Sequence, residues 1–331
     1  MNTSPLLRTM IFRSFFTLLL LGSFCLADDS RFTMQTDTGI GVTTITLDGK
    51  TVVVYRHGED VDLPHFYPWN SSSGRNMVVD ITEPYPHHRA FWVSENSVLL
   101  EGETKPFANY MAVYTGVNKP EVSKWPVAPY GNRSKHITFE NVKSAKTTLE
   151  FDETIHWLAR DTRIADELRH YKFTALENGE YFIDFSFRIV AAYGKLTIKS
   201  DLTHYAWPYI RMNEVFNVEK GKGVITNSEG KVGQGAIDQK PALWVDYSAP
   251  TPNGKMEGLA CFVHPSQTEA VTWLVRDYGC WGPNRKASQH NTTFEVPKGE
   301  ALVQRVGLLI HNGDVNSGNV AERYKIYCAE K

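Results

Sequence analysis

The sequence has few cysteines, no excess of basic residues and only one long apolar run, and each of these absences excludes a class of protein. Four cysteines in 331 residues do not make a disulfide-built scaffold. A balance of 35 basic against 37 acidic residues offers no basic face for nucleic acid, so no nucleic-acid partner is expected. The chain is long enough to bury a large hydrophobic core, so it does not need disulfide bonds for stability.

Several motifs are also missing. The chain has no Gly-x-Gly-x-x-Gly, no phosphate loop and no Gly-x-Ser-x-Gly elbow, which excludes the usual nucleotide cofactors and an α/β-hydrolase. Its 11 histidines include no His-x-His and no His-Glu-x-x-His, and its cysteines form no Cys-x-x-Cys. No cofactor is therefore expected. A metal stays an alternative that would need His88, His204 and His264 to converge on one point.

The apolar run lies at the N-terminus and has the form of an export signal. Arg8 and Arg13 precede the apolar stretch 15–21, and the small residue Ala27 stands before Asp28. This order predicts a signal peptide over residues 1–27. The run is short for a membrane span, which needs about 20 residues, so an uncleaved anchor is the less favoured alternative. We expect a periplasmic or secreted protein with no membrane contact once the signal is removed.

Cys25 leaves with the signal, and three cysteines remain in the mature chain. They are Cys261, Cys280 and Cys328, an odd number that is spread thinly. A bridge between Cys261 and Cys280 and a set of buried free thiols are both open.

The periodicity is that of β-strands. Residues 181–189 alternate between an apolar face and a mostly polar one, which is typical of a half-buried strand. Residues 42–47 and 51–55 flank Asp48-Gly49-Lys50, a hairpin signal. Further strands are predicted at 136–140, 147–151, 195–200, 258–264, 271–276 and 302–310, and one short helix at 320–324, capped by Asn316. The chain is predicted to be all-β, a large antiparallel sandwich forming one domain over residues 28–331.

The densest group of chemically active residues lies at positions 85–92. His87, His88, Arg89 and Trp92 follow Pro86, which favours an extended chain. In an extended chain His88 shares a face with Trp92, and His87 shares one with Arg89. An imidazole can act as acid or base near neutral pH, and an arginine can clamp an acidic group.

Later segments repeat this mixture of rings and charges. The group around His204 ends at Arg211, and Trp244, Asp246 and Tyr247 place a carboxylate between rings. Another group runs from His264 to Trp273, Arg276 and Tyr278. Rings beside polar groups suit a carbohydrate, because rings stack on the C–H faces of sugars; the alternative is that each ring belongs to the core.

These blocks resemble, in order, an exported bacterial family labelled "methane oxygenase PmoA-like", also treated as a domain of unknown function. The resemblance rests on residues 85–92, 225–230, 244–248, 258–266, 273–279 and 305–314, and it covers nearly all of the mature chain. It implies a two-sheet super-sandwich of the galactose-mutarotase type, and such relatives often accompany sugar oxidoreductases and polysaccharide-degrading enzymes. Tyr85, Ala90 and the segments at 203–204 and 281–284 depart from the family pattern, so substrate choice is expected to differ.

Three hypotheses follow. The first is a carbohydrate-active enzyme that acts on a sugar or oligosaccharide by epimerisation, by elimination as a lyase or dehydratase, or by glycoside cleavage. The second is a non-catalytic sugar-binding module. The third is the metal-dependent oxygenase of the family label, which is disfavoured because a membrane-bound monooxygenase subunit has spanning helices that this mature chain lacks. For the first, the predicted acid/base residues are His88, His204 and His264, and the predicted substrate-binding residues are His87, Arg89, Trp92, Arg211, Trp244, Asp246, Tyr247, Trp273, Arg276 and Tyr278.

Overall fold

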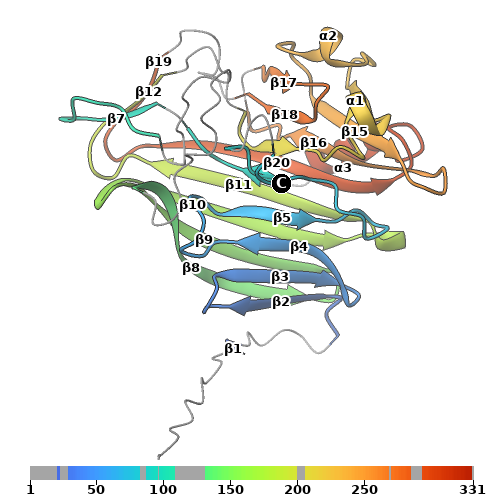
Figure 1. Ribbon diagram of the computed structural model, residues 1–331, viewed down its shortest axis with the longest axis horizontal. Coiled ribbons are helices and arrows are strands. Elements are labelled where there is room, and N and C mark those ends of the chain that lie inside the picture. The colour runs from blue at the N-terminus through green and yellow to red at the C-terminus, as the bar shows by residue number, and fades with distance from the viewer. Residues whose placement is uncertain are drawn as a thin grey trace, which may run out of the picture.

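The computed structural model describes residues 21–22, 29–82, 87–95, 97–108, 131–199, 206–267, 270–284 and 293–329. Within these ranges the chain is built almost entirely from antiparallel strands, as Figure 1 shows. The prediction of an all-β fold made of large antiparallel sheets is confirmed. No helix of the described residues has the length and apolarity needed to cross a membrane.

The larger of two layers is an eight-stranded sheet in the order β14-β15-β16-β20-β11-β10-β9-β8. Its strands are β8 (Asn132–Ala145), β9 (Thr148–Ala159), β10 (Thr162–Ala175), β11 (Tyr181–Val190), β14 (Val224–Asn227), β15 (Trp244–Pro250), β16 (Met256–Val263) and β20 (Ala301–Asn312). The alternation predicted for residues 181–189 is confirmed in β11, where Tyr181, Phe185 and Ile189 are fully buried. The 3₁₀ turn η2 (Glu177–Gly179) joins β10 to β11.

The facing layer begins with a five-stranded sheet in the order β1-β2-β3-β4-β5. Its strands are β1 (Leu21–Gly22), β2 (Phe32–Asp37), β3 (Val42–Leu47), β4 (Lys50–Arg56) and β5 (His65–Trp69). The predicted hairpin is confirmed. Asp48 and Gly49 form its two-residue turn with φ of 50° and 75°, the positive values that such tight hairpins require.

A four-stranded sheet continues the facing layer beside β5. It has the order β17-β18-β13-β6 and contains β6 (Phe91–Trp92), β13 (Tyr209–Arg211), β17 (Trp273–Val275) and β18 (Cys280–Pro283). A three-stranded sheet at one end holds β7 (Val98–Leu100), β12 (Leu196–Lys199) and β19 (Thr293–Val296). The helices are α1 (Val218–Gly221), α2 (Gln234–Ile237) and α3 (Val320–Ala329).

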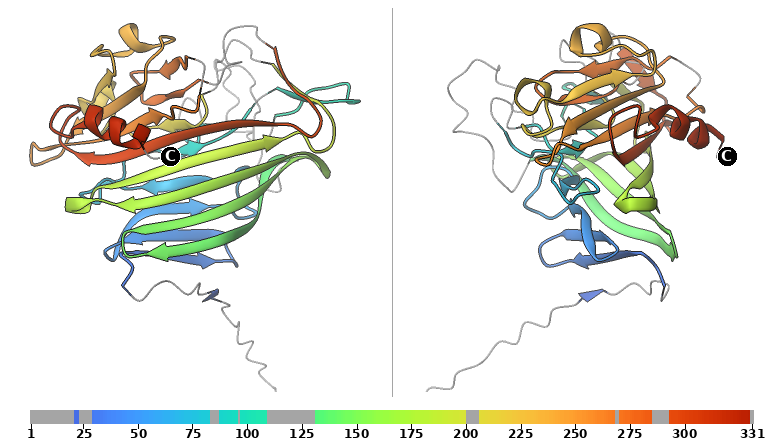
Figure 2. Two further views of the ribbon diagram at one scale, coloured as in Figure 1. Left: turned by 180° about the vertical axis from the view of Figure 1, so that it is seen from behind. Right: turned by 90° about the vertical axis from the view of Figure 1, so that its right-hand side faces the viewer.

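Aromatic side chains fill the space between the two layers. Phe91 of β6 lies 5.4 Å from Phe185 of β11, and Trp281 of β18 lies 5.8 Å from Tyr247 of β15, measured between ring centroids. Figure 1 shows β2–β5 lying across β8–β11. Helix α3 covers the opposite face of the eight-stranded sheet (Figure 2). The helix predicted near the C-terminus is present, but it begins at Val320, so Asn316 precedes it and does not cap it.

Candidate functional site

The four-stranded sheet gathers the side chains that the sequence analysis singled out around positions 88–92. Phe91 and Trp281 point into the core, and Ile210 pairs with both of them in register. The alternation of a strand therefore places Trp92, Tyr209, Arg211 and Cys280 on the other face of this sheet. We call these four residues, together with His87, His88, Arg276 and Tyr278, the His88 group.

Two rings form one wall of the His88 group. Trp92 stacks on Tyr209 with the ring centroids 4.6 Å apart and the planes 6° from parallel. The imidazole of His88 lies 5.6 Å from the Trp92 ring and 5.9 Å from the Tyr209 ring. The prediction that His88 shares a face with Trp92 is confirmed.

His87 and His88 are both buried, and their rings meet edge to face at 4.5 Å. Burial lowers the pKa of His87 to about 4. Burial, with the charges of His87 and Arg211, lowers the pKa of His88 well below its ordinary value. The two rings are therefore neutral at pH 7, which is the state in which an imidazole can accept a proton.

Arg211 supplies the positive charge of the group. Its guanidinium lies 4.3 Å from the ring centroid of Tyr278, and only 6% of the residue is exposed. Its Nε and Nη1 are buried and have no hydrogen-bond partner among the described residues. A buried guanidinium whose N–H groups are unsatisfied costs several kcal/mol, and a ring face offsets only part of that cost. An anionic ligand that accepted these hydrogen bonds would satisfy the guanidinium.

Arg276 occupies the edge of the group and is already paired. Its Nη1 lies 2.6 Å from Asp238 Oδ1, and both side chains are about three-quarters buried. This ion pair fixes the end of β17, because Asp238 also accepts a hydrogen bond from the backbone N–H of Val275. Of the three predicted arginines, Arg89 and Arg276 are paired with carboxylates, whereas Arg211 makes no ion pair with a carboxylate of the described residues.

Arg89 belongs to a separate ion-pair network. Its Nε and Nη2 donate to Asp62 Oδ1 at 3.0 and 2.6 Å, and its Nη1 lies 3.3 Å from Asp80 Oδ2. Asp80 also lies 3.3 Å from His65 Nε2. These contacts anchor the segment that carries His87 and His88, so they give no support to the prediction that Arg89 binds a substrate.

Two predicted rings lie in the core between the layers. Trp273 is fully buried, donates its Nε1–H to the carbonyl of Ala242 at 3.0 Å, and stacks near Trp281. Tyr247 is fully buried, and its hydroxyl bonds the backbone of Val218 and Asp277. Both residues are therefore core rings whose polar ends are satisfied by nearby backbone groups, and the prediction that they bind a sugar is wrong.

Three predicted residues lie on the α3 side of the eight-stranded sheet, in the other layer from the His88 group. Trp244 packs in the small core under α3. Asp246 is buried 2.7 Å from His311 Nε2, and their attraction outweighs burial and raises the pKa of His311. His264 bonds Ser266 through Nδ1, and its ring lies 5.3 Å from that of Tyr327. The predicted shared site of His88 and His264 is therefore wrong.

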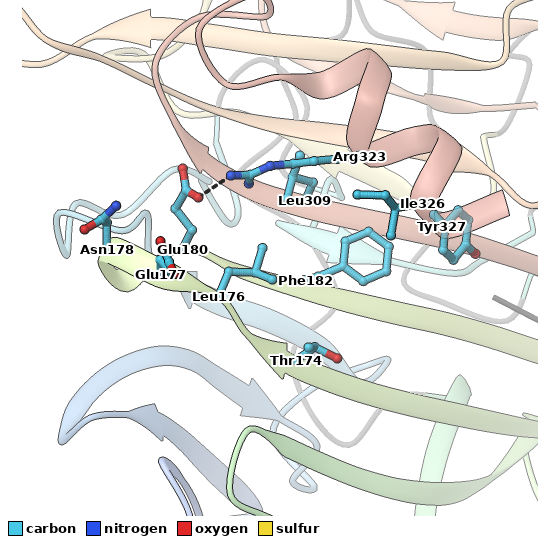
Figure 3. Close-up of a pocket in the computed structure, with 10 residues that line it drawn as sticks. All are labelled: Thr174, Leu176, Glu177, Asn178, Glu180, Phe182, Leu309, Arg323, Ile326 and Tyr327. Carbon is cyan, nitrogen blue, oxygen red and sulfur yellow. Dashed lines mark hydrogen bonds and ion pairs between the residues drawn. The ribbon is translucent and has the colours of Figure 1, made fainter. Parts of the chain in front are cut away.

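The α3 side also contains an apolar pocket of about 340 Å³, shown in Figure 3. Phe182, Leu309, Ile326 and Tyr327 form much of its wall, and an ion pair between Arg323 and Glu180 closes one end at 2.6 Å. None of the predicted site residues lines it.

Other predictions concern His204, the cysteines and a metal. His204 lies outside the described residues. Cys261, Cys280 and Cys328 are free thiols, so the Cys261–Cys280 bridge does not form. Burial raises the pKa of Cys280 to about 12, which keeps it a thiol rather than a nucleophilic thiolate. In the described ranges, no three His, Cys, Asp or Glu side chains are arranged to hold a metal ion.

Sequence reasoning missed Tyr209, Cys280 and Asp238 as members or neighbours of the His88 group. The signal for Tyr209 was present, because it stands two residues before Arg211 and so shares its face in a strand. Cys280 and Asp238 carried no such signal, since pairing of β13 with β18 and an ion pair to Arg276 bring them there.

The chain belongs to a family of unknown function, DUF6807, whose model matches residues 42–325. This description does not carry the PmoA-like name. No curated protein matches the sequence.

Solved structures that are similar to the chain include an aldose epimerase homologue and a galactose 1-epimerase, both at low identity. One is a GalM/aldose epimerase homologue from C. elegans, with 8% identity and a TM-score of 0.31, covering 86% of this chain and 99% of that one. Another is a galactose 1-epimerase from Lactobacillus acidophilus NCFM, with 8% identity and a TM-score of 0.36, covering 88% and 98%. The GH36 alpha-galactosidase AgaA from Geobacillus stearothermophilus has 12% identity and a TM-score of 0.34, covering 84% of this chain and 40% of that one. None is close enough to assign a substrate to this chain.

Proposed function

We propose that this protein is an exported carbohydrate-active enzyme that acts on an acidic sugar in the His88 group. The observation that carries the proposal is the buried guanidinium of Arg211, whose Nε and Nη1 lack hydrogen-bond partners in the described part of the chain. Because Nε and Nη1 lie on different edges of the guanidinium, the carboxylate of a sugar acid would accept a hydrogen bond from one of them and a hydroxyl oxygen of the same ligand would accept from the other. The stacked rings of Trp92 and Tyr209 would meet the apolar face of the sugar.

The chemistry that fits best is removal of the proton on the carbon next to the carboxylate. Neutral His88 would accept that proton, and Arg211 would stabilise the negative charge that develops on the carboxylate oxygens. Return of a proton to the opposite side of the carbon gives an epimer. Loss of a leaving group from the adjacent carbon gives an unsaturated sugar instead. Both outcomes balance without a further reactant.

Glycoside cleavage is less well supported by the same residues. That reaction ordinarily uses two carboxyl groups that flank the scissile bond. Two carboxylates lie near the His88 group among the described residues, and both are already paired: Asp62, whose charge acts on His87, is bound to Arg89, and Asp238 is bound to Arg276. We therefore favour epimerisation or elimination over hydrolysis.

The first test is exchange of the sugar proton with solvent. Oligomers of glucuronic, galacturonic, mannuronic and guluronic acid would be incubated with the protein in D₂O, with deuterium uptake followed by mass spectrometry and unsaturated product by ultraviolet absorbance. We expect uptake or elimination with at least one acidic oligomer, and neither with neutral oligomers. Replacing Arg211 with Met should lower kcat/KM by about 100-fold, the loss typical of a buried charged partner.

Two further variants make the test specific. His88→Gln should abolish exchange and leave binding of the acidic oligomer within a few-fold of wild type. Arg188→Met is the matched control, because Arg188 is an exposed arginine on β11 and should behave as wild type. Equal activity of Arg211→Met and wild type would refute the proposal. Binding of an acidic oligomer without any exchange would favour the second candidate, a non-catalytic binding module built on the Trp92–Tyr209 stack.

A further inference from the structure

A second polar site lies at the other end of the facing layer, in a cleft of about 760 Å³. It opens between the edge strand β8 of the larger sheet and the turns that follow β2 and β4. This volume is within the range of small-molecule sites. The lining residues that matter are His57, His136, Phe139 and the three threonines Thr36, Thr38 and Thr138.

His136 is held in one orientation by a buried glutamate. Its Nδ1 donates to Glu153 Oε1 at 2.7 Å, so Nε2 is the nitrogen left for the cleft. Glu153 is buried, and its other oxygen accepts a hydrogen bond from Tyr55 at 2.6 Å. Burial raises the pKa of Glu153, but its bonds to His136 and Tyr55 and the charge of Arg169 outweigh this effect, and the net pKa is lowered. A carboxylate behind an imidazole is the arrangement by which proteins fix a ring and its tautomer.

The backbone is irregular at this position in a way that directs the ring. The pairing of β8 with β9 shifts register between His136 and Thr138, so Ile137 is bulged outward and is exposed. Bulges next to functional sites re-aim the neighbouring side chains. The opposite wall depends on close packing of Gly41 against Gly58, where a Cβ on Gly41 would lie 2.1 Å from the Gly58 Cα.

The character of the walls indicates a neutral, hydroxyl-rich ligand. At the mouth, Glu59 is bound to Arg133 Nη1 at 2.6 Å and Lys135 Nζ at 2.9 Å. Deeper in, His57 is neutral at pH 7 and shares a hydrogen bond of 3.0 Å with Thr43. The Phe139 ring, 4.4 Å from the His136 ring, adds an apolar surface. Hydroxyls, imidazoles and a ring face are the groups that contact sugar hydroxyls and C–H faces.

We propose that this cleft is a second binding site, for a segment of neutral glycan, in which Nε2 of His136 makes the central hydrogen bond to a sugar hydroxyl. Glu153 is a positioning residue that acts through His136. The site is built from different strands than the His88 group and does not depend on the proposed function.

The test is titration calorimetry at pH 7.5 with neutral hexasaccharides: α-1,4-glucan, β-1,4-glucan, β-1,4-xylan and β-1,4-mannan. We expect at least one to bind, and His136→Ala to weaken it by about tenfold or more. The matched control is His170→Ala, because His170 makes the same 2.7 Å bond from Nδ1, to Asp152, outside the cleft on an exposed part of β10. That variant should bind as wild type.

Further variants keep the test decisive. Glu153→Gln should weaken binding less than His136→Ala, and adding it to His136→Ala should weaken binding no further, whereas a purely structural role for Glu153 would give an additional loss. Thr138→Val replaces His136→Ala if the latter fails to fold. Arg211→Met should retain neutral-glycan binding, which separates this site from the proposed function. Absence of binding by all four hexasaccharides would overturn the proposal, as would loss of binding in Arg211→Met or full binding in His136→Ala and Thr138→Val.

Discussion

At the scale of single residues, the molecule holds several imidazoles in their neutral form. The rings of His57 and His136 lie 4.2 Å apart, so a charge on one opposes a charge on the other. Burial, with the charge of His136, lowers the pKa of His57 to about 4, although Glu153 opposes the shift. An unfolded chain would titrate the same ring near 6.5. Protonation of His57 is therefore linked to unfolding.

This linkage predicts a loss of stability in mild acid. Between pH 6.5 and about 4, His57 is protonated in the unfolded chain but stays neutral in the folded protein. The free energy of unfolding therefore falls as pH falls. A shift of this size corresponds to roughly 3 kcal/mol near pH 4. Urea unfolding at pH 7.5 and 4.5 should show a smaller loss for His57→Gln than for wild type.

Other histidines act in the same experiment, so the comparison between variants is what isolates His57. His87 and His88 also have lowered pKa values and add to the loss in acid, whereas His311, whose pKa is raised by Asp246, opposes it. His170→Gln is the control, since this ring is 40% exposed and makes its contact on the surface. An equal acid-induced loss in His57→Gln and wild type would contradict the prediction.

At the scale of elements, the hairpin β3–β4 shows how directly a turn follows from its residues. Gly49 has φ of 75°, and a Cβ added there would meet open space, so only backbone strain opposes a substitution. Gly49→Ala should lower the free energy of unfolding by about 1 kcal/mol. Gly235→Ala in α2 is the matched control. It also meets open space but has a helical backbone, and it should be neutral or slightly stabilising in the same thermal and urea measurements.

Strand length separates the elements that the sequence could predict from those that it could not. Long strands such as β11 were predictable, because alternation over many residues leaves one orientation that buries the apolar face. The three-residue strands β13 and β17 carry too little alternation to say which face meets the core. For this reason Arg211 and Trp273 were both predicted to bind substrate, although the structure places Arg211 near His88 and Trp273 in the core.

At the scale of the whole molecule, both sites depend on contacts between segments far apart in the sequence. The His88 group needs β6, β13 and β18 to pair, and the cleft beside His136 needs β8 to lie next to the turns that follow β2 and β4. No local pattern contains that information. His136 lay in the strand predicted at 136–140 and Glu153 lay just beyond the one predicted at 147–151, and only the register of β8 with β9, together with its bulge, brings the two side chains into hydrogen-bond contact.

The layers share one continuous core, and this predicts that residues 28–331 fold as a single unit. The buried cluster runs from Phe32 in the five-stranded sheet to Ile310 in β20 and includes Trp281 of the four-stranded sheet.

Protein recovered from the periplasm should begin at Asp28 on N-terminal sequencing. It should unfold with one midpoint by tryptophan fluorescence and far-UV circular dichroism. Strand β1 adds only the pairs of Leu21 and Gly22 with β2, so its loss should shift the midpoint by no more than about 3 °C. Two separated transitions would instead show that the halves of the sandwich unfold independently, and a first residue of Met1 would show that the signal is not removed.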